Sequence, residues 1–216
     1  MEILNLDLEL SPDLIQELAD YVMREEYRFP PDGADCPYSP TNKEDKLYST
    51  WTPNNGLVKF PESIEDWYRK KVRSVTIKLG LYGRSEVENV MWCQIYTNKT
   101  DGHPVHTHYC GEELFSWVHF VKAPTDQKCF YFVDSNSNKI YPEDQSSGRF
   151  LVFPSWAMHG VDAVESCEEP RIVVAGNVLA KKYKIHPFES NTYVISRSKK
   201  GDISWNITAD NYDSNY

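Results

Sequence analysis

Four of the six histidines lie in one short stretch, "DGHPVHTHYCGEELFSWVHF", residues 101–120. Two of them, His106 and His108, are separated by a single residue. In a β-strand the side chains of residues i and i+2 point to the same face, so both imidazoles can reach one metal ion. The spacing therefore predicts a pair of metal ligands, and a third ligand must come from elsewhere in the chain.

His159 is the best candidate for the third ligand. It ends the segment "GRFLVFPSWAMH", in which a glycine leads into an apolar strand and Pro154 follows that strand. A histidine just beyond a buried strand is placed to face inward at the mouth of a barrel. Three ligands on one side of a metal leave coordination positions open, which suits a metal that must also bind substrate or oxygen.

Arg171 follows His159 by twelve residues and begins the apolar segment "RIVVAGNVL". We expect this segment to be a strand that is buried on at least one face. An unpaired buried charge is costly, so the guanidinium of Arg171 needs an anion. That anion is either a carboxylate of the protein or a carboxylate of a ligand, which arginine can bind in bidentate geometry.

The elements that must position these residues can be read from the pattern of apolar and turn residues. Residues 11–27 are predicted to form a helix capped by Ser11, and a second helix is predicted from Pro61 to about Leu81. Regular short strands separated by turns then indicate a sandwich or barrel. The predicted strands are 47–51, 87–97, 114–121, 128–133, 149–153, 161–164, 171–179, 192–196 and 203–208.

These elements predict a mainly β fold with N-terminal helices. We expect one domain over residues 1–216, with a helical and loop region at 1–86, a β core at 87–180 and a C-terminal extension at 181–216. A formal charge of −9 disfavours binding to phosphate backbones, so no nucleic-acid partner is expected.

The cysteines and the apolar runs bear on the compartment. The chain has five cysteines, an odd number, with no C-x-x-C pair, which fits reduced cytoplasmic thiols better than a disulfide framework. No apolar run approaches the ~18 residues of a membrane span, and the first residues do not have the pattern of a signal peptide. We therefore expect a cytoplasmic protein without a membrane partner.

Four segments carry a resemblance to a known family: "HTH", "LFSWVHFVKAP", "GRFLVFPSWAMHGVDAV" and "RIVVAGNVL". Together they resemble the iron(II)- and 2-oxoglutarate-dependent dioxygenases, on the prolyl-hydroxylase-like side, and are most similar to a bacterial and phage branch. The resemblance covers about residues 88–180. It implies a double-stranded β-helix (a jelly roll, cupin-like) with the metal at its open end, and a bacterial or phage-infected host cell as the setting.

The resemblance also assigns roles to individual residues. His106 and His159 match two of the metal ligands, with His108 in the position of the third. Arg171 matches the basic residue that pairs with the distal carboxylate of 2-oxoglutarate, and Tyr96 matches a tyrosine that contacts this co-substrate. The implied cofactors are Fe(II), 2-oxoglutarate and O2. The implied reaction hydroxylates a small-molecule or peptide substrate and releases succinate and CO2.

The chain departs from the family pattern at several positions. His108 stands where the family has an aspartate, and Phe120 stands where many hydroxylases have a tyrosine that contacts the co-substrate. Tyr131 is a candidate to supply the lost hydroxyl. Val173 replaces the usual serine or threonine. Asn177 matches the end of the same strand, where the resemblance implies a polar wall of the pocket.

These departures leave alternatives open. Glu112 or Glu113 could replace the missing carboxylate ligand. A cupin-like three-histidine metalloenzyme that does not use 2-oxoglutarate is a second interpretation, which His108, Phe120 and Val173 favour. A non-catalytic jelly-roll binding module is a third, and the oligomeric state is not indicated by the sequence.

The remaining histidines of the opening stretch are expected to have other roles. His103, in the loop beside Pro104, is expected to be exposed. His119 is expected either to form a hydrogen bond in the core or to line the pocket. Trp156 precedes His159 by three residues, so it is a candidate for the wall of a substrate pocket as well as for the core.

Overall fold

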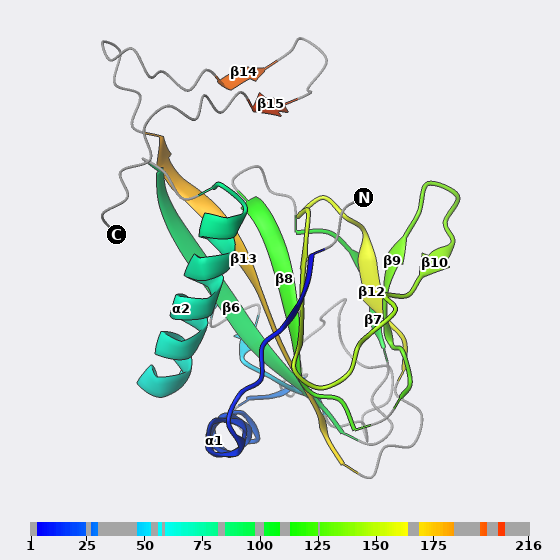
Figure 1. The fold of residues 1–216 in the computed structure, drawn as a ribbon. Helices are drawn as coiled ribbons and strands as arrows, with labels where there is room; N and C mark the ends of the chain where they lie inside the picture. The colour runs from blue at the N-terminus through cyan, green and yellow to red at the C-terminus, as the bar shows by residue number, and fades with distance from the viewer. Residues whose placement is uncertain are drawn as a thin grey trace.

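The computed structural model shows a chain that is mostly β, with two helices in the part of the chain that it describes (Figure 1). Every strand pair in that part is antiparallel. This agrees with the predicted mainly β fold with N-terminal helices. The described residues are 4–24, 27–29, 47–52, 56–57, 59–81, 85–97, 102–108, 113–124, 126–163, 169–183, 195–197 and 203–205.

The larger sheet has seven strands in the order β1-β11-β8-β13-β6-β3-β2. The strand β13 lies in its middle and pairs with β6 on one side and β8 on the other. These three are the longest strands, so they form the platform on which the rest of the fold is built. The bounds are β1 Leu4–Asp7, β2 Arg28–Phe29, β3 Leu47–Ser49, β6 Ser85–Tyr96, β8 Glu113–Lys122, β11 Arg149–Phe153 and β13 Arg171–Tyr183.

A smaller sheet of four strands, in the order β10-β9-β12-β7, faces one side of this platform (Figure 1). From β6 to β13 the chain passes back and forth between the two sheets. The bounds are β7 His103–His106, β9 Phe130–Val133, β10 Lys139–Ile140 and β12 His159–Val161. Two further strand pairs are β4 Trp51–Thr52 with β5 Gly56–Leu57, and β14 Ile195–Arg197 with β15 Ile203–Trp205.

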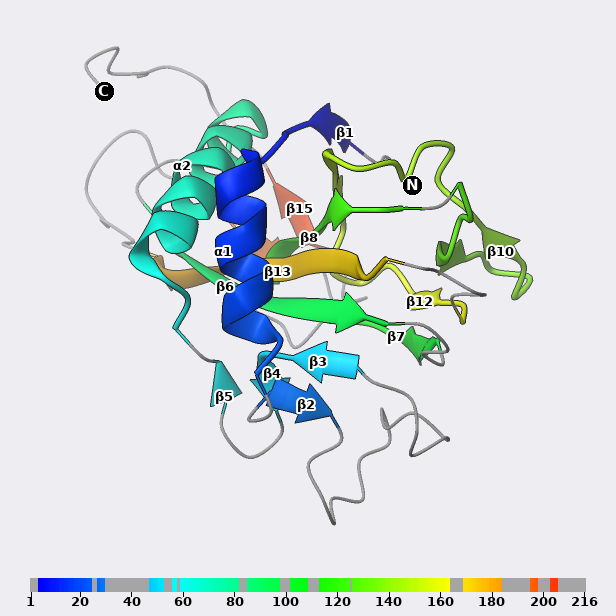
Figure 2. The ribbon, with the colours of Figure 1, turned by 90° about the horizontal axis from the view of Figure 1, so that it is seen from below.

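Both helices, α1 Pro12–Val22 and α2 Glu62–Lys78, lie on the other side of the larger sheet (Figures 1 and 2). Ser11 caps α1 as predicted, with the Leu14 backbone N–H donating to its Oγ at 3.4 Å. The predicted helix extended to residue 27, but the backbone leaves helical geometry at Met23. Within the described residues, neither helix has the length and apolar composition needed to cross a bilayer.

Two apolar cores lie on the two faces of the larger sheet, and the alternation of side chains along β13 decides which residues enter which core. Ile172 and Val174 pack in the core between this sheet and the helices. Val173 and Ala175 pack in the core between the two sheets. Because side chains alternate along a strand, Arg171 is in phase with Val173 and so faces the smaller sheet. This inter-sheet face is where the candidate site lies.

Most predicted strands are found with shifted ends, but the segment 47–51 divides between β3 and β4, and only Val161 of the segment 161–164 is a strand residue among those described. Strand β11 has the bounds that the sequence predicted, while β13 continues past residue 179 to Tyr183. Strand β12 begins two residues before the predicted segment, which makes His159 a strand residue. Strand β7 was not predicted, because the segment "HPVH" is short and contains a proline. Parts of the segments predicted at 192–196 and 203–208 lie outside the described residues.

Candidate metal centre

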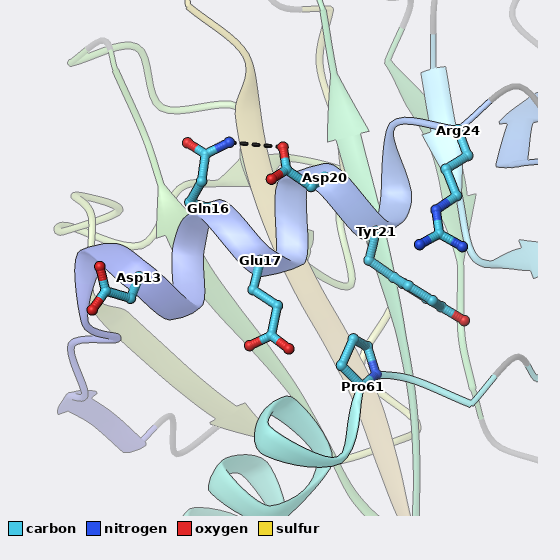
Figure 3. Close-up of a pocket in the computed structure, with 7 residues that line it drawn as sticks. All are labelled: Asp13, Gln16, Glu17, Asp20, Tyr21, Arg24 and Pro61. Carbon is cyan, nitrogen blue, oxygen red and sulfur yellow. Dashed lines mark hydrogen bonds between the residues drawn. The ribbon is translucent and has the colours of Figure 1, made fainter.

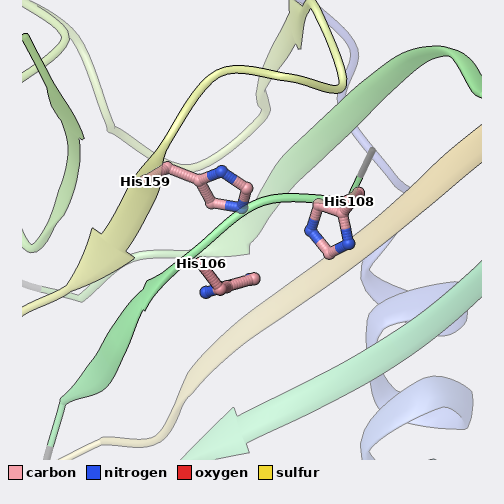
Figure 4. Close-up of side chains that lie close together, drawn as sticks. All are labelled: His106, His108 and His159. Atoms are coloured by element: carbon pink, nitrogen blue, oxygen red, sulfur yellow. The ribbon is translucent and has the colours of Figure 1, made fainter. Parts of the chain in front are cut away.

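His106, His108 and His159 converge on one point between the ends of β7 and β12 (Figure 4). One potential ligand nitrogen from each ring lies within 4.8 Å of the other two. The ring centroids are 4.4 Å apart for His106 and His159, and 5.0 Å apart for each of the other two pairs. The structure therefore brings together the three histidines that the sequence singled out.

Strand pairing and one loop hold these residues in place. His106 and His159 are direct neighbours across the β7–β12 pair, so their side chains start close together on one face. His108 lies just after β7, and its backbone N–H donates to the carbonyl of Ser155 at 3.1 Å. The hydroxyl of Thr107 donates to the same carbonyl at 2.8 Å. The loop before β12 thus fixes both the second and the third histidine.

Two of the rings are oriented by hydrogen bonds to backbone carbonyls. Nδ1 of His106 lies 2.8 Å from the carbonyl oxygen of Pro104, and Nδ1 of His159 lies 2.8 Å from that of Ala157. A carbonyl can only accept, so the proton is on Nδ1 in both rings and the lone pair is on Nε2. This is the arrangement in which metal-binding histidines are held by their outer partners.

Burial keeps all three imidazoles neutral. It lowers the pKa of His108 to about 3 and that of His159 to about 4, with the neighbouring imidazoles adding to the shift. Burial also lowers the pKa of His106, against the opposing effect of its bond to Pro104. Metal binding requires neutral imidazole, so these rings need not lose a proton before they bind an ion near neutral pH.

His103 was expected to be exposed, and this prediction is wrong. It is half-buried, and its ring centroid lies 4.7 Å from that of His106. The cause is a β-bulge: His159 pairs with His106 and Val161 pairs with His103, so the interval on β7 has one residue more than the interval on β12. In a regular strand, residues i and i+3 point to opposite faces, and the extra residue turns both histidines to the same side. A proline inside a strand is the signal that could have revealed the bulge.

Arg171 lies on the same inter-sheet face and is 5% exposed. Its guanidinium carbon is 5.3 Å from the centre of the Phe120 ring and 5.8 Å from that of its cross-strand neighbour Tyr96. The Nη1 atom is buried and has no hydrogen-bond partner among the described residues. A buried cationic donor without an acceptor is costly, so this position is suited to an anionic ligand.

The structure places the two predicted co-substrate tyrosines differently. Tyr96 is buried beside Arg171, and its hydroxyl donates to Gln94 Oε1 at 2.8 Å. Burial raises the pKa of Tyr96 to about 12, although Arg171 opposes the shift. Tyr131 lies on the other face of β9, where its ring is 4.4 Å from Lys139 Nζ, while its neighbours Phe130 and Phe132 pack between the sheets. The structure therefore does not bring Tyr131 to the histidines or to Arg171.

Trp92 and Asn177 lie on the same inter-sheet face as Arg171, further along the larger sheet. Asn177 is 9% exposed and accepts a hydrogen bond from Ser116 Oγ at 2.8 Å. The half-buried Trp92 has its ring centroid 5.3 Å from that of His108, a contact that the sequence did not indicate. Trp92 pairs with Ala175, so it lies between the levels of Arg171 and Asn177 along the sheet.

Two other aromatic residues of the sequence analysis lie away from the histidines. His119 is fully buried on the helix side of the larger sheet, with Nδ1 2.8 Å from the Tyr68 hydroxyl. Its ring stacks on Trp67 at 5.7 Å, so of its two expected roles the structure shows the core hydrogen bond. Trp156 is 59% exposed in the loop before β12, which places it outside the core.

A surface depression on the opposite side of the protein contains neither a histidine cluster nor a buried arginine (Figure 3). It lies along α1, across the larger sheet from the histidines, and two of its three carboxylates accept hydrogen bonds from neighbours. Gln16 donates to Asp20 at 2.8 Å, and Ser63 donates to Glu17 at 2.7 Å. The depression is lined by Asp13, Gln16, Glu17, Asp20, Tyr21, Arg24 and Pro61.

The sequence matches no family model and shows no significant match to a curated protein. The fold, in contrast, is similar to solved structures. A prolyl-4-hydroxylase of Pseudomonas putida is 15% identical with a TM-score of 0.56, and the match covers 83% of this chain and 92% of that one.

Two further solved structures are similar to the same extent. An oxidoreductase of the 2OG-Fe(II) oxygenase family from Burkholderia pseudomallei is 13% identical, with a TM-score of 0.56 and coverage of 82% and 84%. A prolyl hydroxylase of Trichoplax adhaerens, solved with a hypoxia-inducible-factor peptide, is 15% identical, with a TM-score of 0.55 and coverage of 83% and 84%. At these identities the similarity shows the fold, and the chain has the fold of the 2-oxoglutarate- and iron(II)-dependent oxygenases.

Proposed function

We propose that the protein is a non-haem iron(II)- and 2-oxoglutarate-dependent dioxygenase that hydroxylates a small-molecule or peptide substrate. The observation that carries the proposal is the pairing of two features on one inter-sheet face. Three histidines have ring nitrogens within 4.8 Å of one another, and Arg171, on the same inter-sheet face, is buried with an unpaired donor; both support the proposal. Iron(II) and the distal carboxylate of 2-oxoglutarate are the two ligands that such a pair would take.

We also propose that the strands from β6 to β13 form a double-stranded β-helix. Support comes from the alternation of successive strands between the sheets. Strands β6, β8, β11 and β13 lie in the larger sheet, and β7, β9, β10 and β12 lie in the smaller one. The histidines would then lie at one end of the β-helix, where β7 ends and β12 begins.

The residues present fit an iron(II) centre. Two of the three rings carry the lone pair on Nε2, and first-row divalent metals accept such neutral nitrogen ligands. His106, His108 and His159 would hold the metal on one side and leave positions open. When bound, iron(II) and 2-oxoglutarate supply the activation of O2, with release of succinate and CO2.

The protein's own groups bind and orient. Arg171 would hold the distal carboxylate of 2-oxoglutarate through Nη1, between the rings of Phe120 and Tyr96. These rings exclude water from the guanidinium, which strengthens its interaction with an anion. The hydroxyl of Tyr96 already donates to Gln94, so we assign its ring, rather than its hydroxyl, the main part in shaping this end of the pocket.

A second candidate function follows from His108. The three-histidine group contains no carboxylate from the described residues, which favours a cupin-like metalloenzyme that does not use 2-oxoglutarate. Glu113, one of the two glutamates considered as a replacement ligand, is not part of the group, and Glu112 lies outside the described residues.

An anaerobic titration with iron(II) and then 2-oxoglutarate separates these functions. The dioxygenase should bind iron and then develop the weak visible charge-transfer band of a chelated 2-oxo acid. Iron binding without the band would favour the three-histidine enzyme that does not use 2-oxoglutarate. A protein that binds no iron would instead be a binding module, and the proposed function would be wrong.

A further inference from the structure

With iron(II) bound, the candidate centre would hold more positive charge than 2-oxoglutarate can neutralise. This charge count rests on the proposed function. Iron(II) brings two positive charges, and the three histidines bind it as neutral ligands. No carboxylate of the described residues joins them. The guanidinium of Arg171 adds a third positive charge, and the dianion of 2-oxoglutarate removes two. One positive charge remains.

The remaining charge would lie in a partly enclosed place, since His106 and His108 are half-buried and His159 is buried. His159 is 4% exposed and Arg171 is 5% exposed, and the core around them is built from rings and aliphatic side chains. An uncompensated charge in such surroundings is unfavourable, and the metal dominates the local electrostatics. An aspartate in place of His108 would have compensated it from within. The described residues supply no such carboxylate at the histidines, and Glu112 lies outside them, so a bound anion is one source of the compensating charge.

One polar group is oriented to receive that anion. The Oδ1 atom of Asn177 accepts a hydrogen bond from Ser116 Oγ at 2.8 Å. The amide nitrogen therefore points away from Ser116. In the described part of the chain this is the one hydrogen bond of the Asn177 side chain. Its N–H groups are thus available to an acceptor.

The position of Asn177 relative to the histidines supports this role. The indole of Trp92 contacts His108, and Trp92 pairs with Ala175 on β13. Asn177 is on the same face as Ala175, about 7 Å further along the strand, at the usual rise of a β-strand. Arg171 lies about 13 Å from Ala175 in the other direction along β13, at the same rise per residue. Arg171 and Asn177 therefore lie on opposite sides of the level of Trp92 along the sheet, and we assign one anion to each.

We propose that the substrate carries a carboxylate that compensates the remaining charge at the metal and accepts a hydrogen bond from the amide of Asn177. The substrate class is thus a monoanionic carboxylic acid. A small inorganic monoanion has the same charge, and the experiment below distinguishes the two.

Acetate is the probe for a carboxylate, and cobalt(II) is a spectroscopic substitute for iron(II). The protein is loaded with cobalt(II) and saturated with 2-oxoglutarate without oxygen, and acetate, azide and chloride are titrated separately while the visible cobalt bands are followed. Acetate should change the bands saturably and bind more tightly than azide or chloride. Equal or tighter binding of the inorganic anions would overturn the assignment of a carboxylate.

Two variants test the charge count. His108→Asp supplies a carboxylate from the chain, so acetate affinity should fall by about tenfold or more while cobalt is still bound. Val105→Asp is the matched control, because Val105 is 41% exposed on β7 and the substitution adds an equal charge on the surface, outside the centre. Its effect should not exceed about twofold, since exposed charges are screened. Equal acetate affinity in His108→Asp and the natural protein would overturn the charge count.

Two more variants test the receiving group. Asn177→Leu keeps the size of the side chain and removes the donor, so acetate affinity should fall by about tenfold with 2-oxoglutarate affinity unchanged. Ser116→Ala keeps the amide but releases its orientation, and a smaller loss is expected. Thermal unfolding curves establish that both variants fold. If both fold and bind acetate like the natural protein, Asn177 is not the receiving group.

Failure of this inference is distinguishable from failure of the proposed function. Cobalt and 2-oxoglutarate binding are measured before any anion is added, and loss of either would overturn the proposed function together with the charge count. Binding of both without any response to acetate would overturn only the carboxylate substrate.

Discussion

At the scale of single residues, the rings of His106 and His159 are held in place by the protein itself. Each Nδ1 donates to a carbonyl two residues earlier in the chain, at 2.8 Å. Rings held in this way lose little freedom when a metal binds, so the site is organised in advance. His108 differs, because its position depends on the backbone bond to Ser155 and on the contact with Trp92.

The first prediction distinguishes the ligands from their neighbour. His159→Ala should reduce cobalt(II) affinity by at least about a hundredfold, because a structural partner cannot replace a lost ligand. His103→Ala is the matched control: its ring contacts that of His106, but it is not one of the three whose nitrogens lie within 4.8 Å of one another. Its effect should stay below about tenfold. Calorimetric titration of both variants checks the ranking, and a reversed order would remove His159 from the ligand set.

The second prediction separates a functional arginine from a structural one. Arg171→Met removes a buried cation whose Nη1 has no partner in the described residues, so the apo protein should be as stable as the natural protein or more stable. The affinity for 2-oxoglutarate should nevertheless fall by about a hundredfold, since a charge-assisted pair is lost. Thermal unfolding and 2-oxoglutarate titration are both measured. A large loss of stability with unchanged 2-oxoglutarate affinity would instead indicate that Arg171 is structural.

The sequence predicted the face of the sheet that a side chain occupies only where two residues had the i and i+2 spacing of a regular strand. The i and i+2 spacing of His106 and His108 was enough to predict that they meet. Tyr131 was assigned to the co-substrate by its residue type, but β9 alternates, and its flanking phenylalanines occupy the inter-sheet face. His103 was missed because an extra residue in β7 changes the phase of that strand, and the pairing of β7 with β12 shows where this bulge lies.

At the scale of elements, the helices and the long strands were predictable and the short edge strands were not. Strands β6, β8 and β13 are rich in β-branched and aromatic residues, which identify a strand without knowledge of its partners. Strand β7 has four residues and a proline, and it is a strand because β12 pairs with it. The candidate site is built on the pair of β7 and β12. Its position in the sequence was therefore predicted from the histidines and not from a predicted strand β7.

The third prediction concerns the contact between α2 and the larger sheet. Burial lowers the pKa of His119 to about 4, with the Leu8 carbonyl opposing the shift, so the folded protein binds this proton less readily than the unfolded chain. A group of this kind stabilises the fold above its unfolded pKa of about 6.5, and the stability is lost as the pH falls toward 4. The loss amounts to about 3 kcal/mol for His119 alone.

His119→Gln isolates this contribution, because glutamine does not titrate and can still form a hydrogen bond with Tyr68. Chemical unfolding of the metal-free proteins between pH 7 and 4 should show a steeper loss of stability for the natural protein than for the variant. The other buried histidines contribute equally to both proteins, so the difference between the two curves belongs to His119. Parallel curves would show that the buried ring is not the source.

At the scale of the whole molecule, the larger sheet separates two tasks. The core on its helix side contains Tyr68, Trp117 and His119 in close ring contacts, with a hydrogen bond between Tyr68 and His119 Nδ1. The face toward the smaller sheet contains Arg171, with an unpaired Nη1, and the three histidines that we propose as metal ligands. Ligands should therefore stabilise the protein through one face only.

The last prediction uses this separation. A ligand that binds only the folded state adds about 2.7 kcal/mol of stability at a concentration of a hundred times its Kd. For a chain of this size, such a gain corresponds to a rise in Tm of roughly 5–10 °C. Cobalt(II) with 2-oxoglutarate should produce a rise of this order under nitrogen, and a chelator should reverse it. His159→Ala should show no rise, whereas His119→Gln should show the full rise from a lower starting Tm. A full rise in His159→Ala would place the bound metal somewhere other than the histidine cluster.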